Sequence, residues 1–104
     1  MPLFLCYCPD RPDHLAQRLA VRAEHLKRGE LDNQAGIVKY GKPFLPPPDA
    51  KPHGLPEGTP NIGGSFMIYE FPSLEACWAR LKEDVYWTAD VWNKEKMAVE
   101  ELMP

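Results

Sequence analysis

Three nitrogen-bearing side chains, Arg18, Arg22 and His25, stand at positions i, i+4 and i+7 of one stretch of the chain. On an α-helix each residue turns the chain by about 100°, so these positions lie close together. Two guanidinium groups and an imidazole held there could converge on one small anionic or enol-like ligand. The spacing is also typical of a packing face, on which the arginines extend along the core edge and His25 is an ordinary boundary histidine. Spacing alone favours this second interpretation.

The helix that must carry these side chains is predicted from Leu15 to about Asn33, with Gly36 in the position of a C-terminal cap. Two carboxylates and a proline in residues 10–13 suit its N-terminus. Arg18 and His25 border the predicted packing stripe, whose members fall within roughly 60° of one another on the helix: Leu15, Leu19, Arg22 and Leu26.

Composition and charge exclude several classes of protein. The 104 residues are 44% hydrophobic and 26% charged, as in an ordinary globular domain. A net charge of −3, without a cluster of Lys or Arg, argues against nucleic-acid binding. No apolar run is long enough to span a membrane, and the first ten residues lack the basic region of a signal peptide. We therefore expect a soluble, cytoplasmic chain.

The three cysteines fit this expectation. Cys6 and Cys8 form a C-x-C pair without a second cysteine pair or a histidine pair nearby, which is weak evidence for a metal site. Cys77 lies in a predicted amphipathic helix. In a reducing compartment, this odd count predicts buried free thiols and no metal.

Three segments predict strands. Pro2–Cys8 is apolar and aromatic, and Gly63–Phe71 is the clearest strand pattern in the chain. Between them, Ile37–Phe44 alternates loosely, and we expect its strand to be kinked or bulged near Gly41.

A second helix is predicted to begin at Ser73, a good N-cap, and to end at about Lys82. Residues 91–104 favour a helix by propensity but are also compatible with a last strand. The expected core face of the second helix has the spacing i, i+3, i+4 and i+7: Leu74, Cys77, Trp78 and Leu81.

Residues 45–62 interrupt the pattern with six of the twelve prolines. Such a segment cannot form a helix or a central strand, so it is either a lid over a site or a solvated excursion. The run Pro46–Pro48 would make a lid stiff. His53 is expected to be exposed to solvent rather than functional.

The predicted order is strand, helix, strand, proline-rich loop, strand, helix and an ambiguous last element. If that element is a strand, the fold is α+β: a ferredoxin-like split β-α-β sandwich, with a four-stranded antiparallel sheet and two helices. The helices would cover one face of the sheet. The bare face then predicts a dimer.

The chain resembles the YCII-related (YciI-like) family of dimeric α/β-barrel proteins. The resemblance covers a single domain over residues 1–104, apart from Pro46 to Asn61 within the proline-rich loop 45–62. It implies that the last element is a strand and that two sheets pack face to face in a homodimer. The segments that carry it are LFLCYC, RLAVRAEHL, Gly41-Lys42-Pro43, GGSFMIYEFPSLEA and Glu83-Asp84-Val85-Tyr86 with Ala89-Asp90-Val91.

The resemblance also implies a His–Asp pair, formed here by His25 and Asp84. Val85 and Ala23 stand where the family often has proline. An aspartate that accepts a hydrogen bond from one imidazole nitrogen fixes the tautomer and raises basicity, so the other nitrogen can move a proton.

Arg22 and Arg18 would then hold an enolate, phenolate or carboxylate, and Ser65 and Tyr86 could add neutral hydrogen bonds. No nucleophile elbow, phosphate-binding loop or metal-ligand cluster is present in the sequence. We therefore expect general acid–base catalysis without a cofactor, by elimination, isomerisation or cyclisation of a small cyclic or aromatic molecule.

Two alternatives stay open. The same cleft could capture a small organic acid without reaction, and replacement of His25 would then weaken binding only. Some dimeric α/β-barrel folds bind haem through a histidine, and a Soret band in the purified protein would reveal such a site.

Overall fold

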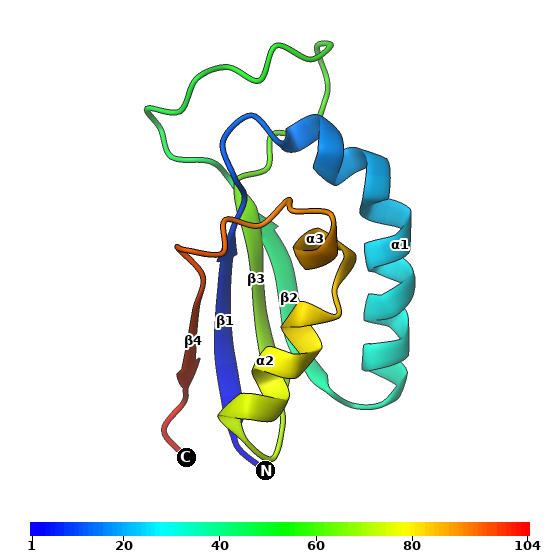
Figure 1. Ribbon diagram of the computed structural model, residues 1–104, viewed down its shortest axis with the longest axis vertical. Helices are drawn as coiled ribbons and strands as arrows, with labels where there is room; N and C mark the ends of the chain where they lie inside the picture. The colour runs from blue at the N-terminus through cyan, green and yellow to red at the C-terminus, as the bar shows by residue number, and fades with distance from the viewer.

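Four antiparallel strands form one sheet in the order β2-β3-β1-β4, and the helices cover a single face of it (Figure 1). This computed structural model describes residues 1–104. The architecture is the ferredoxin-like α+β fold predicted above. Its elements are β1 (Leu3–Pro9), α1 (Leu15–Gln34), β2 (Val38–Phe44), β3 (Gly64–Glu70), α2 (Leu74–Lys82), α3 (Val85–Thr88) and β4 (Ala98–Glu101).

The core lies between the sheet and the helices. Alternate residues of the two central strands face it, because successive side chains of a strand point to opposite faces. Cys6 of β1 pairs with Met67 of β3 and also contacts Cys77 of α2, with the two sulfurs 3.5 Å apart. The three cysteines are buried and free, as predicted. The core cluster consists of Phe4, Cys6, Cys8, Met67, Tyr69, Cys77, Leu81, Tyr86, Val91 and Trp92.

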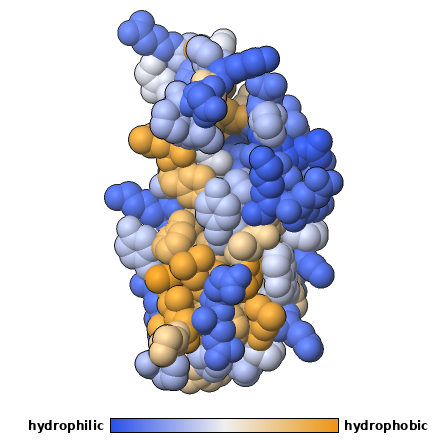
Figure 2. Space-filling view, turned by 90° about the vertical axis from the view of Figure 1, so that its left-hand side faces the viewer, coloured by the Kyte–Doolittle hydropathy of each residue, from blue (hydrophilic) through white to orange (hydrophobic).

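The opposite face of the sheet carries no helix. The pairs Leu5–Ile68 and Tyr7–Phe66 of β1 and β3 point outward there, and Tyr7 is 42% exposed. Figure 2 looks onto the β4 side of the molecule and shows hydrophobic residues gathered over its lower part, whereas the upper part is mostly hydrophilic.

The packing face predicted for α1 is wrong in part. Leu15 is buried, but Arg22 is exposed and Leu26 is 50% exposed. The buried positions in the rest of the helix are instead Arg18 and Asp32. A charged face can pack inward here because each buried charge finds an opposite charge on another part of the fold, as described below.

The other differences are local. The irregularity expected near Gly41 in β2 falls between Val38 and Tyr40, directly before it. In α2, Cys77 and Leu81 are buried as expected, but Leu74 is 46% exposed. The last element is a strand, but it is only four residues long.

The proline-rich segment leaves the sheet between β2 and β3 and arches beyond its end (Figure 1). Its two ends meet closely, since the Gly63 amide donates to the Phe44 carbonyl over 2.7 Å. A Cβ on Gly63 would lie 2.5 Å from the Pro46 Cα, so only glycine allows this approach. None of the three helices combines the length and the apolar character needed to cross a bilayer.

The cap of α2 gives a first prediction. The Ser73 hydroxyl accepts a hydrogen bond from the Ala76 amide over 3.1 Å. Ser73→Ala should therefore lower the free energy of unfolding by about 1 kcal/mol. Ser73→Asp keeps an acceptor at the helix N-terminus and should cost much less. Urea denaturation measures both variants, and equal losses would contradict a capping role.

Candidate active site

His25 of α1 contacts Asp84, which lies between α2 and α3. Its Nδ1 is 2.9 Å from one carboxylate oxygen and 3.0 Å from the other. An ionised carboxylate only accepts hydrogen bonds, so Nδ1 carries the proton and donates it to this contact. In the neutral form of the ring, Nε2 is unprotonated. The side chain of Asp84 is 0% exposed and that of His25 is 18% exposed, so the imidazole shields the carboxylate from water.

Two further donors hold Asp84. Its Oδ1 accepts from the Tyr86 amide over 2.9 Å, which caps the short helix α3. Its Oδ2 accepts from Arg80 Nη2 over 3.2 Å. Burial by itself raises the pKa of Asp84, but the hydrogen bond and positive charge of His25, with the other donors, outweigh it and leave the pKa lowered.

A chain of alternating charges continues behind this pair. Arg80 is 3% exposed and donates through Nε to Asp32 of α1 over 2.6 Å. Asp32 in turn accepts from Arg28 over 3.2 Å. The series Arg28–Asp32–Arg80–Asp84–His25 therefore joins α1 to α2 and fixes the carboxylate that supports the imidazole.

Tyr86 supports His25 by stacking. The two ring centroids are 4.1 Å apart, with an angle of 18° between the planes. The guanidinium of Arg18 lies 4.3 Å from the centroid of the same tyrosine ring. Burial raises the pKa of Tyr86, so its phenol stays neutral at physiological pH.

Arg18 is a second buried anchor. It donates to Asp10 over 2.8 Å and to the Ser65 hydroxyl over 2.8 Å, and Ser65 also accepts from the Trp92 indole over 3.4 Å. Burial raises the pKa of Asp10 to about 6, against the opposing effect of Arg18. Residues 10–13 lie directly before α1, as the sequence predicts, but the carboxylate of Asp10 pairs with Arg18, one turn inside the helix.

A cavity of about 190 Å³ lies between α1 and the strands β2 and β3. Its lining contains four cationic residues, Arg18, Arg22, Lys42 and Arg80, and no acidic one. Arg18 and Arg80 are paired with carboxylates, whereas Arg22 and Lys42 form no ion pair within the chain. Lys42 stands opposite the outward-facing Phe66 in the strand register. Arg22 is the cation without an ion pair that lies on the same helix as His25, one turn before it.

The structure thus groups the predicted site residues in two layers. His25, Arg22, Arg18 and Ser65 line the cavity, while Asp84 and Tyr86 are buried and lie outside its lining. Sequence reasoning missed Arg80, Asp32 and Asp10. One feature of the sequence could have indicated Arg80. It is a charged residue between Cys77 and Leu81, two positions of the core face predicted for the second helix.

Comparison with known proteins identifies the family. Residues 2–100 match the YCII-related domain. The chain belongs to the YCII-related family. Two proteins named YciI, from Escherichia coli O6:H1 and Shigella flexneri, are each 37% identical to it over 91 residues, which cover 88% of either chain.

One solved structure carries a function in its name. The 5-chloro-2-hydroxyhydroquinone dehydrochlorinase TftG from Burkholderia phenoliruptrix AC1100, in complex with 2,5-dihydroxybenzoquinone, superimposes with a TM-score of 0.74. The two sequences are 26% identical, and the match covers 97% of this YCII-related chain and 93% of TftG. The family and the fold expected from the sequence are therefore confirmed.

The lowered pKa of Asp84 makes stability depend on pH. Its contribution is present above the unfolded-state pKa of about 3.9 and is lost as pH falls through the lower pKa of the folded state. Asp84→Asn keeps an acceptor for the cap, but it removes the negative charge between His25 and Arg80 and leaves Asp32 as the only charge partner of Arg80. The weaker hydrogen bonds should cost roughly 2 kcal/mol at pH 7, and the gap to wild type should narrow below about pH 4.

Urea unfolding across this pH range measures the effect. Asp90→Asn is the matched control, because Asp90 is 54% exposed and its ion pairs are worth little. A gap that stays constant with pH would contradict this assignment of the charge network.

Proposed function

We propose that this YCII-related chain is an acid–base enzyme of the lyase or isomerase type, needing no cofactor, that acts on a small cyclic or aromatic molecule. The observation that carries the proposal is the contact of 2.9 Å between Asp84 and His25 Nδ1 at a cavity surrounded by cations. The support from relatives is one structural neighbour named as a dehydrochlorinase.

The chemistry follows from the protonation of the ring. Nδ1 donates to Asp84, so Nε2 can accept a proton from a hydroxyl or from a carbon next to a carbonyl. Asp84 stabilises the imidazolium that results. Arg22 and Arg18 stabilise the enolate or phenolate by charge-assisted hydrogen bonds, and Ser65 orients Arg18. In an elimination, the leaving group departs with the electrons of its bond as a new double bond forms.

The size and charge of the cavity indicate the substrate class. An apolar cavity of about 150 Å³ binds benzene, so 190 Å³ suits one six-membered ring with small substituents. The excess of cationic residues favours a molecule that becomes an anion during the reaction. A chlorinated hydroxyhydroquinone, the compound class named for the structural neighbour, meets both criteria.

His25→Gln tests the proposed base. With 5-chloro-2-hydroxyhydroquinone as the probe, we expect the variant to lower kcat/KM for chloride release by roughly 100-fold or more. Arg22→Gln should act mainly by lowering kcat, because the anion that Arg22 stabilises forms only during the reaction. Lys27→Gln removes an exposed charge on the same helix and is the control.

Chloride release by His25→Gln at the wild-type rate would refute the acid–base role. The alternative of a binding module predicts another result: saturable binding of the same probe, weakened in His25→Gln, with no turnover by the wild type.

We also propose that the chain forms a homodimer through the bare face of the sheet. Outward-facing Leu5, Phe66 and Ile68 leave an apolar surface on β1 and β3 that no helix covers. An apolar patch of this kind typically marks an interface between proteins.

Light scattering coupled to size-exclusion chromatography should therefore give twice the chain mass. Ile68→Glu places a charge in the centre of this face and should produce monomer. Leu31→Glu is the matched control, since Leu31 is 57% exposed on α1. A monomeric wild-type chain would contradict the proposal.

A further inference from the structure

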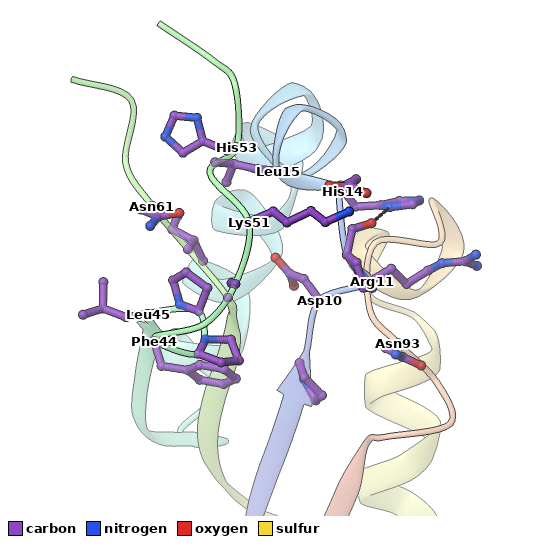
Figure 3. Close-up of a pocket in the computed structure, with 18 of the residues that line it drawn as sticks. Asp10, Arg11, His14, Leu15, Phe44, Leu45, Lys51, His53, Asn61 and Asn93 are labelled. Atoms are coloured by element: carbon purple, nitrogen blue, oxygen red, sulfur yellow. Dashed lines mark hydrogen bonds between the residues drawn. The ribbon is translucent and has the colours of Figure 1, made fainter. Parts of the chain in front are cut away.

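A second and larger cavity, of about 990 Å³, lies beneath the proline-rich loop at the N-terminal end of α1 (Figure 3). Its volume is at the upper end of the range for small-molecule sites. The two cavities share only Ile62 among their lining residues. The Asp10–Arg18 ion pair separates them, with Asp10 lining the larger cavity and Arg18 the smaller one.

Asp10 is the residue of this cavity that indicates a ligand-binding site. Its side chain is 6% exposed, and Arg18 satisfies Oδ1, but Oδ2 is buried without any hydrogen-bond partner. Figure 3 shows the carboxylate directed into the space beneath the loop. A buried acceptor without a partner costs free energy, and a hydroxyl or amine donor on a ligand would remove that cost.

The walls indicate a flat molecule. Tyr7 and Phe44 stack on each other with centroids 5.3 Å apart and planes 8° from parallel, and both residues line the cavity. Pro46–Pro48 form part of the lining from the loop side. Proline side chains and aromatic rings present apolar surfaces that lose little conformational entropy when a ligand packs on them.

The charges indicate a neutral ligand. Three acidic residues of the lining, Asp10, Asp13 and Asp49, balance three basic ones, Arg11, Lys51 and Lys96. The smaller cavity differs in this respect, since its lining holds four cationic residues and no acidic one. The two spaces are therefore suited to different molecules.

We propose that the cavity beneath the proline-rich loop is a binding site for a neutral, flat, hydroxylated aromatic molecule larger than one ring, with Asp10 Oδ2 accepting its hydroxyl hydrogen. This site is distinct from the one at His25 and does not depend on the function proposed for it.

The probe for this site is 2-naphthol, whose two fused rings exceed the smaller cavity. Titrated into the ¹⁵N-labelled chain and followed by NMR, it should shift the amides of Ala50, Lys51 and Asn61 in a saturable manner. The matched probe 2-methoxynaphthalene has the same rings without the donor. It should bind roughly tenfold more weakly, the factor for one hydrogen bond to a charged group.

Two variants complete the test. In Asp10→Asn, Arg18 still needs an acceptor, so the amide oxygen takes the position of Oδ1. The NH₂ group, which is a donor, then takes the position of Oδ2 and cannot accept the hydroxyl hydrogen of the ligand. We therefore expect 2-naphthol to bind about tenfold more weakly to this variant. Ala50→Trp fills the cavity from the exposed loop without touching Asp10, and it should abolish the shifts. Ala23→Trp, an exposed position on α1 that lines neither cavity, should leave them unchanged.

Three results would overturn the proposal: no saturable shifts, shifts centred on Gly29 and Gly41 of the smaller cavity, or equal affinity for both probes. Equal binding of 2-naphthol to wild type and Asp10→Asn would also do so. If Asp10→Asn fails to fold, the two probes with the wild type and Ala50→Trp still decide the question.

Discussion

The structure depends on one constraint: α1 packs against the rest of the fold through charged side chains. Arg18 and Asp32 are buried, and His25 is partly buried between them. A buried charge without a partner costs several kcal/mol, so each of these groups requires an opposite charge at a fixed position. Asp10 at the end of β1, together with Arg80 and Asp84 from α2 and the turn after it, supplies those charges.

The same constraint accounts for the geometry at His25. The imidazole is not held by a loop but by a helix whose rotation is fixed at two points, Arg18 two turns before it and Asp32 two turns after it. Asp84 is fixed in turn by its own helix cap and by Arg80. A site built in this way is ordered before any ligand arrives, which is the condition for efficient electrostatic catalysis.

Much of the fold could be predicted from the sequence, because alternation and capping are local signals. The limits of β3, to within one residue at each end, and the Ser73 cap of α2 follow from such patterns. The rotation of α1 could not be predicted in this way. A hydrophobic stripe places Arg22 and Leu26 inside. The partners that draw Arg18 inward are Asp10, directly after β1, and Ser65 on β3, and neither belongs to the helix. The last strand had helical propensity, and only the family resemblance identified it.

The contact of His25 with Asp84 was expected from the same resemblance, but the residues behind it were not. Arg80 looks like a solvated charge on an amphipathic helix until Asp32 is placed beside it. A buried Asp10 is likewise indistinguishable in the sequence from a helix-capping carboxylate. Long-range pairing of charges has no periodicity, so sequence patterns do not reveal it.

The alternating series from Arg28 to His25 has a consequence for how this sequence can change over evolutionary time. Loss of a single member leaves an excess of buried charge of one sign, whereas loss of two adjacent members of opposite sign keeps the charges balanced. Arg80 and Asp32 should therefore be exchanged together or kept together among relatives, for example as an arginine–aspartate pair or as two apolar residues. Their substitutions are epistatic, and the route between the two states passes through a less stable intermediate.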